Sequence, residues 1–161
     1  MIFLILGTQK FQLNRLLKEV DSLCEAGVIC ESVYAQKGHS DYLPQFYEFT
    51  DFLDKQSFNR EIERSSLVIT HSGVGGIISA LEFRKPIIVY PRLSKYKEHI
   101  DDHQLEIAET FRKKNYVLCC NEKDDLGALI KEARNHFFAQ YKSSTDNIIN
   151  IVKEFLEQNV K

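Results

Sequence analysis

The stretch that decides the fold is SLVITHSGVGGIISAL, residues 66–81. It opens with an apolar run from Leu67 to Thr70, and short runs of this kind are typical of a strand buried on both faces of a parallel sheet. Gly73, Gly75 and Gly76 follow the strand, and an apolar segment continues to about Phe83. The stretch therefore predicts a buried strand, a tight turn rich in glycine, and a helix.

Similar apolar runs and helical patterns alternate along the rest of the chain. Further strands are expected at Ile2–Leu6, Ser32–Ala35, Gln45–Phe49, Ile87–Tyr90 and Tyr116–Cys119, and further helices at about residues 11–26, 57–65, 100–113, 124–138 and 145–158. The last helix follows the cap-like Ser143-x-x-Asp146. This order predicts an α/β, Rossmann-like parallel sheet of about six strands with helices on both faces, because each crossover packs a helix back onto the sheet. A single domain over residues 1–161, with its core at about 1–140, is expected.

The bulk composition limits the classes of partner. The formal net charge of −2, from 21 basic and 23 acidic residues, gives no overall attraction to nucleic acid or to an anionic membrane. The opening apolar run ends at Gly7, far short of the roughly 20 residues of a spanning helix, so a cytoplasmic protein is expected. The four cysteines form no CxxC pair and are expected to be reduced and structural.

Polar or glycine-rich segments follow the predicted strands, at the edge of a parallel sheet where ligands bind. These segments are Gly7–Gln9, Gln36–His39, Thr50–Asp54, His71–Gly76 and Arg92–His103. The glycines after residue 72 allow close backbone approach, and the helix that follows favours an anion, so this loop is interpreted as a phosphate-binding turn. A tight turn without a ligand is the alternative. The pattern is neither the GxGxxG dinucleotide fingerprint nor a P-loop, which disfavours NAD, FAD and P-loop ATPase chemistry.

A second informative stretch is EHIDDHQLEIA, residues 98–108. His103 and Gln104 fall on the core-facing stripe of the first helical turn, where they are predicted to hydrogen-bond a polyhydroxylated ligand; a satisfied helix cap is the alternative. The neighbouring His99, Asp101 and Asp102 do not form an Asp-x-Asp motif, and adjacent carboxylates on a helix point apart. No essential metal and no cofactor are therefore expected.

The motifs GTQKF, AQKG, SLVITHSGVGGIISAL, KPIIVYPR and EHIDDHQLEIAE, in this order, resemble the C-terminal donor-binding domain of glycosyltransferase family 28 over roughly residues 1–115. The chain is also similar to the small subunits of pneumococcal-type capsular or exopolysaccharide β-1,4-galactosyltransferases and of the eukaryotic dolichol-linked GlcNAc transferase. The resemblance implies the C-terminal half of a GT-B enzyme. A separate membrane-anchored partner subunit would then supply the other half and recruit the acceptor.

The function that this resemblance implies is inverting, metal-independent transfer of a hexose, first galactose, from a UDP-sugar to a lipid-diphosphate-linked saccharide in surface polysaccharide synthesis. The chain would lie at the inner face of the membrane through its partner, and the general base would belong to the partner, so no catalytic residue is assigned. The rival interpretations are a non-catalytic UDP-sugar sensor or assembly subunit and a domain similar to sugar-nucleotide epimerases.

The resemblance also implies a set of donor-binding residues. They are Gly7, Thr8, Gln9, Gln36, Gly38, Phe52, Leu53, His71, Ser72, Gly73, Gly75, Gly76, Ser79, Arg92, His103 and Gln104. Helix N-termini near Thr8-Gln9 and Gly75-Gly76 would stabilise the leaving UDP, with Arg92 adding a cation. The backbone near Phe52-Leu53 would contact the uracil, and His103 and Gln104 the sugar. Ser79 stands where longer relatives carry an acidic residue for the ribose hydroxyls.

Overall fold

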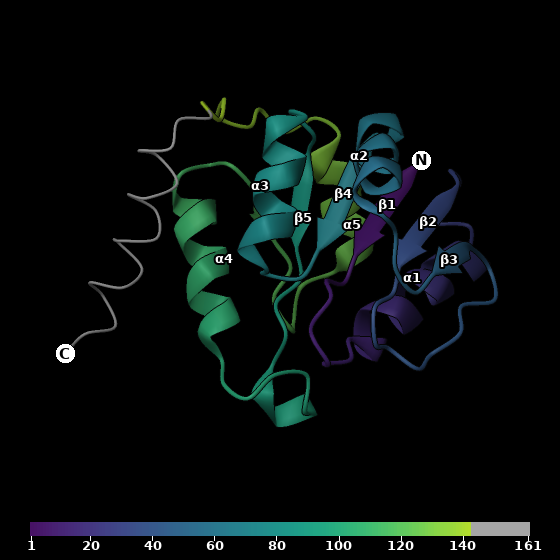
Figure 1. Ribbon diagram of the computed structural model, residues 1–161. Coiled ribbons are helices and arrows are strands. Elements are labelled where there is room, and N and C mark those ends of the chain that lie inside the picture. Colours follow the sequence, from purple (N-terminus) through teal and green to yellow (C-terminus); the bar gives the residue numbers. More distant parts are fainter. Residues whose placement is uncertain (143–161) are drawn as a thin grey trace.

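Six parallel strands form the central sheet of the computed structural model, which describes residues 1–142 (Figure 1). The strands are β1 (Ile2–Ile5), β2 (Val33–Gln36), β3 (Glu48–Thr50), β4 (Leu67–Thr70), β5 (Ile87–Val89) and β6 (Leu118–Cys119). They lie in the order β3-β2-β1-β4-β5-β6, and every neighbouring pair is parallel. The predicted α/β, Rossmann-like sheet is confirmed.

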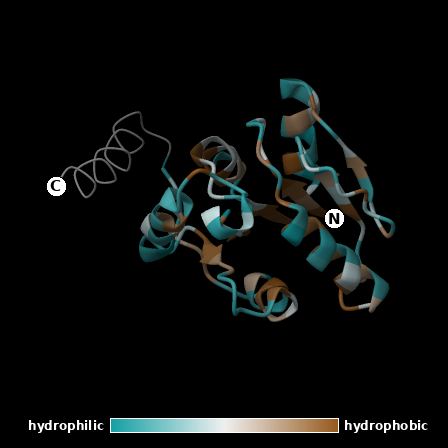
Figure 2. Ribbon diagram, turned by 90° about the horizontal axis from the view of Figure 1, so that it is seen from below, coloured by the Kyte–Doolittle hydropathy of each residue, from teal (hydrophilic) through white to brown (hydrophobic). Residues whose placement is uncertain are grey.

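Helices cover both faces of this sheet, as predicted. They are α1 (Asn14–Glu25), α2 (Lys55–Arg64), α3 (Val74–Glu82), α4 (His103–Lys113) and α5 (Leu126–Ala133), with a short 3-10 turn at Ser94–Tyr96. Successive strand residues point to opposite faces, so Ile2 and Leu4 of β1 pack with α1 and α5, whereas Phe3 and Ile5 pack with α2, α3 and α4. Figure 2 shows the apolar strands at the centre of the molecule.

The strand order places a topological switch point between β1 and β4. The chain leaves β1 toward β2 and β3 on one side and returns to β4 on the other, with Ile5 beside Thr70 at the carboxyl ends of the two strands. The connections leaving these two strands turn to opposite faces of the sheet, so a crevice opens between them at this edge. The loops Gly7–Gln9 and His71–Gly73 follow the two strands and border that crevice.

Several predicted boundaries differ from the structure, and hydrogen bonds explain two of them. The third strand begins at Glu48 rather than Gln45, because the buried carboxylate of Asp21 accepts the Gln45 and Phe46 amides at 2.9–3.0 Å and so removes them from the ladder. The first helix begins at Asn14, since the Leu13 amide donates to the Ser40 hydroxyl. The fifth helix ends at Ala133, and the predicted helix at 145–158 with its cap at 143–146 lies outside the described residues.

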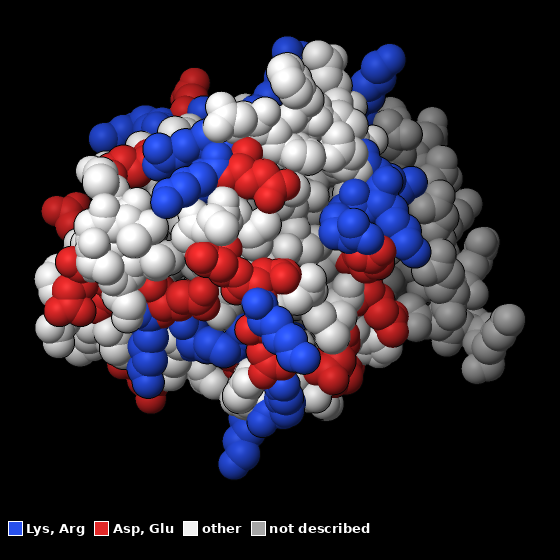
Figure 3. All heavy atoms as spheres, turned by 180° about the vertical axis from the view of Figure 1, so that it is seen from behind, with Lys and Arg blue, Asp and Glu red and all other residues white. Residues whose placement is uncertain are grey.

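The surface and the thiols agree with the composition. Acidic and basic side chains are interspersed over the face shown in Figure 3. The four cysteines are free, and burial raises the pKa of the Cys119 and Cys120 thiols to about 12, which makes both poor nucleophiles. Within residues 1–142, no helix combines the length and apolarity needed to cross a bilayer.

Candidate functional site

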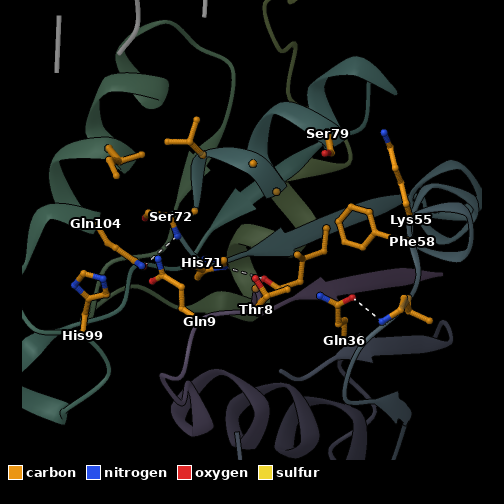
Figure 4. A pocket seen from close by; sticks show the side chains of 18 of the residues that line it. Thr8, Gln9, Gln36, Lys55, Phe58, His71, Ser72, Ser79, His99 and Gln104 are labelled. Carbon is orange, nitrogen blue, oxygen red and sulfur yellow. Dashed lines mark hydrogen bonds between the residues drawn. The ribbon is translucent and has the colours of Figure 1, made fainter. Parts of the chain in front are cut away.

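A cavity of about 700 Å³ opens at the carboxyl edge of the sheet, over β1 and β4 (Figure 4). Most of the predicted site residues line it: Gly7, Thr8, Gln9, Gln36, Leu53, His71, Ser72, Gly73, Gly75, Gly76, Ser79, His103 and Gln104. Its other lining residues are Ile5, Lys55, Phe58, Asn59, Val74, His99 and Ile107. The switch point and the glycine-rich turn therefore belong to one site.

The His71 imidazole fills the space between the two loops that border the crevice. A Cβ atom added to Gly7 would lie 2.6 Å from His71 Cε1, and one added to Gly73 would lie 2.2 Å from His71 Nε2. Neither separation is sterically possible. Gly7 also has a φ of +76°, a conformation that favours glycine. Both glycines are thus required by the position of the histidine ring.

Hydrogen bonds fix the tautomer of His71. Its Nδ1 lies 3.3 Å from the Ile5 carbonyl oxygen, and because a carbonyl can only accept, Nδ1 carries the proton. Burial and the nearby positive charge of Arg92 lower the pKa of His71 to about 4. The ring is therefore neutral at neutral pH, with an unprotonated Nε2.

The first turn of α3 presents backbone amides to the cavity. Gly73 is the N-cap residue, and no side chain caps the turn. A Cβ on Gly75 would meet nothing within 4 Å, whereas one on Gly76 would lie 3.1 Å from Thr70 Oγ1. Gly76 thus allows α3 to pack on β4, and Gly75 leaves the amide side of the turn open. An uncapped helix N-terminus of this kind favours an anion.

Gln104 joins two loops behind the cavity. The side chain is buried, and its Oε1 accepts the Ser72 amide at 3.3 Å and the Arg92 amide at 3.1 Å. The acceptor half of Gln104 is therefore committed to the protein, which leaves its two Nε2 protons for a ligand. His103 differs, because its half-exposed ring lies 3.6 Å from Asp101 and 3.5 Å from Glu106. These are contacts with neighbouring carboxylates rather than the predicted alternative of a satisfied helix cap, because the N-cap residue of α4 makes no side-chain cap hydrogen bond.

Three predicted site residues do not line the cavity. Gly38 lies beneath Gly7, where its φ is +57° and an added Cβ would be 2.6 Å from the Gly7 carbonyl oxygen. Phe52 is 44% exposed and packs on His39. Arg92 is buried behind the wall of the cavity. The sequence places these residues at the correct edge of the sheet, but local packing turns them away from the space itself.

Local hydrogen bonds also bear on two predicted backbone contacts. The Leu53 amide donates to Gln36 Oε1 at 3.1 Å, so this N–H is not available to a base. No residue of α1 lines the cavity, and the Asn14 amide is taken by Gln12 Oε1 at 2.7 Å. Of the two helix N-termini predicted to face the ligand, only that of α3 does so.

The start of α2 contributes three lining residues that the sequence analysis missed. Lys55, Phe58 and Asn59 are three and four positions apart, a spacing that places them on one face of a helix. This spacing, directly after the polar loop at 50–54, is the feature of the sequence that indicates a helix face beside the site. His99, which the sequence places among possible metal ligands, lines the cavity while its ring packs on Phe11.

In the part of the chain that the structure describes, the lining residues include one lysine and three histidines but no aspartate or glutamate. The nearby acids are occupied elsewhere; for example, Asp54 caps α2 by accepting the amides of Gln56 and Ser57. Among residues 1–142, no three His, Cys, Asp or Glu side chains come together in a way that could hold a metal ion. The charged and titratable side chains of the lining are therefore a lysine and histidines, which suits the cavity to an anionic ligand.

Comparisons with known proteins agree with this geometry. Residues 1–159 match the model of the glycosyltransferase family 28 C-terminal domain. The chain is 32% identical over 103 residues to the UDP-N-acetylglucosamine transferase subunit ALG13 of Candida albicans, which covers 64% of this chain and 33% of the relative. It is 30% identical over 115 residues to the Yarrowia lipolytica subunit of the same name, covering 71% and 53%. The chain thus spans between a third and about half of these relatives.

The fold is also that of a solved relative. The solution structure of an ALG13 protein superposes with a TM-score of 0.63 at 19% identity, and the match covers 94% of this chain and 93% of that one. At this identity the likeness concerns the fold alone.

Gln104→Ala is predicted to destabilise the protein, because it leaves two buried amides without an acceptor, at about 1–3 kcal/mol each. His103→Ala, one residue away on the same turn, is predicted to change the free energy of unfolding by less than about 0.5 kcal/mol, since its contacts are exposed. Urea denaturation of both variants checks this. Equal stability of the two variants would contradict the assigned role of Gln104.

Gly73→Ala is predicted to destabilise the protein strongly, because the added methyl group overlaps the His71 ring. Gly75→Ala is the matched control, and it is predicted to leave stability unchanged or to raise it by up to about 1 kcal/mol through better helix propensity. Thermal unfolding of the pair measures the difference. A Gly73→Ala variant as stable as wild type would mean that His71 does not occupy the space between the loops.

Proposed function

The chain belongs to the glycosyltransferase family 28 C-terminal domain family, and we propose that it binds the UDP-sugar donor of a glycosyltransferase in the cavity over β1 and β4. The observation that carries the proposal is the uncapped first turn of α3, which opens into a cavity without a carboxylate. A nucleoside diphosphate is an anion that such a turn can bind through backbone amides. The donor diphosphate accordingly lies against Val74 and Gly75.

The same arrangement supports the chemistry of transfer. When the bond between the anomeric carbon and the UDP oxygen breaks, the electron pair leaves with UDP, and negative charge grows on the diphosphate. The amides at the start of α3 stabilise that charge without rearrangement. Lys55 lines the same cavity and adds a cation. UDP is thereby made a better leaving group.

The acceptor hydroxyl attacks the anomeric carbon from the side opposite UDP, which inverts its configuration. The group that takes the hydroxyl proton must lie on that side. Among the described residues no carboxylate lines the cavity, and the pKa of His71 is about 4, so this ring is a weak base. As the family resemblance implies, we place the general base on a partner subunit that faces the cavity, and this partner also brings the membrane-bound acceptor.

The relatives guide the choice of donor. Two of them are named UDP-N-acetylglucosamine transferase subunits, so UDP-GlcNAc is the first donor to test and UDP-galactose, the sequence-based prediction, the second. A lipid-diphosphate-linked saccharide remains the proposed acceptor, at the inner face of a membrane. Ser79 and the Gln104 amide line the cavity as neutral hydrogen-bonding groups for the donor hydroxyls.

We predict that the protein binds UDP more tightly than ADP, and that Gly75→Val weakens UDP binding by roughly tenfold or more, the cost of one lost hydrogen bond to a charged group. The valine side chain would project into open space, so the fold is retained while approach of the phosphate is blocked. Isothermal titration calorimetry measures both effects, with Gly75→Ala as the smaller, graded change. Equal affinities for UDP and ADP, or an unchanged affinity in Gly75→Val, would refute the assignment.

We further predict that the purified chain has little transferase activity and that co-expression with its membrane-anchored partner restores it, because the acceptor and the base lie on that partner. The assay follows transfer from labelled UDP-GlcNAc or UDP-galactose to a lipid-linked acceptor. Full turnover by the chain alone would rule out the two-subunit proposal. A reconstituted pair that binds UDP but transfers no sugar would favour the non-catalytic sensor.

A further inference from the structure

Arg92 occupies an unusual position for a charged residue. It follows β5, and its side chain is only 1% exposed. A single nitrogen, Nη2, donates to the Leu6 carbonyl at 2.7 Å and to the Phe11 carbonyl at 3.0 Å. These two carbonyls flank the loop 7–10, which includes the Gly7–Gln9 border of the cavity. Arg92 thus holds both ends of that loop from behind.

These hydrogen bonds orient the amide of Gly7. In a trans peptide unit, the carbonyl and the N–H point in opposite directions. The Leu6 carbonyl points at the buried guanidinium, so the Gly7 N–H points away from it, toward the cavity that Gly7 lines. The loop therefore presents a backbone donor to the same space as the first turn of α3.

The positive charge of Arg92 is not neutralised by a bound carboxylate. Its Nε and Nη1 atoms are buried and have no hydrogen-bond partner among the described residues. Glu98 acts on Arg92 through its charge but makes no hydrogen bond to it, because it is held by Arg15 through two bonds of 2.9 and 3.1 Å and also accepts the Leu93 amide. Burial lowers the pKa of Arg92 only to about 10, so the group stays charged. A buried charge without a close partner is costly, and an anion nearby offsets that cost.

We propose that Arg92 is a positioning residue for the donor diphosphate: it fixes the loop 7–10 from behind and supplies a buried positive charge whose counter-ion is the bound diphosphate. The inference rests on the proposed function, because it takes a nucleoside diphosphate as the ligand. Arg92 does not line the cavity, so it acts through the loop and through its field rather than by direct contact. Its charge already reaches the cavity wall, since it depresses the pKa of His71.

The test compares UDP with uridine, which lacks the phosphates, in wild type and in the variants Arg92→Gln and Arg92→Lys. We expect Arg92→Gln to weaken UDP binding by roughly tenfold, as for the loss of a partly buried charge, while uridine binding changes by less than about twofold. Arg92→Lys keeps the charge and is expected to retain most of the UDP affinity. Arg112→Gln, which removes the same charge from an exposed position on α4, is the control.

An unchanged UDP affinity in Arg92→Gln would overturn the inference, as would equal losses for UDP and uridine, which indicate a distorted cavity. An Arg92→Lys variant as weak as Arg92→Gln would also overturn the role of the charge. If wild type binds no UDP, the proposed function itself fails, and the two failures are distinct. If Arg92→Gln does not fold, the NMR signal of the Arg92 Nε–H group is followed in the wild-type protein instead. Inorganic pyrophosphate is expected to shift this signal, and uridine is not. The absence of a shift with pyrophosphate would contradict the inference.

Discussion

The packing of the His71 imidazole between the loops after β1 and β4 is the constraint on which the rest of the site depends. The ring leaves no room for a Cβ atom at Gly7 or Gly73. The Ile5 carbonyl also accepts the Thr70 hydroxyl at 2.9 Å, so the two central strands are joined at the same point that orients the ring. Because each loop has a glycine residue next to the ring, the cavity wall is formed there by backbone atoms rather than by side chains.

Polar side chains at this edge hold the backbone in place and leave the cavity open. Gln104 joins the loops after β4 and β5, and Arg92 holds the loop after β1. Carboxylates serve the same purpose: Glu98 binds Arg15 and the Leu93 amide, and Asp54 caps α2. Among residues 1–142, no aspartate or glutamate lines the cavity. The described lining thus carries a lysine and backbone amides but no carboxylate, which matches the charge of a nucleoside diphosphate.

This division of roles has a consequence for substitutions. A change at Gly73 or Arg92 alters the frame that holds the loops, so its effect on a ligand is indirect, whereas a change at Gln104 alters both the frame and a group that faces the ligand. A change at Gly75 alters only the surface that a ligand meets. Two residues of the same motif, Gly73 and Gly75, therefore have different physical roles, although both are small and both border the cavity.

The sequence by itself determined the order of strands and helices and the edge at which the site lies. Buried parallel strands need continuous apolar runs such as Leu67–Thr70, and a strand that passes directly into a helix needs glycine in the turn. Both features can therefore be recognised in the amino-acid sequence. The same reasoning identified Gly7, His71 and Gln104 as site residues, and all three line the cavity.

Only the tertiary structure decided which groups face the ligand. Gly38, Phe52 and Arg92 follow strands in the same way as the true lining residues, yet one lies beneath a loop, one points to solvent and one is buried behind the wall. Lys55 and Asn59 enter the cavity because α2 packs beside it. The direction of a side chain at a strand end depends on hydrogen-bond partners that are distant in sequence, such as Leu6 for Arg92 or Gln36 for Leu53, and residue spacing carries no information about those partners.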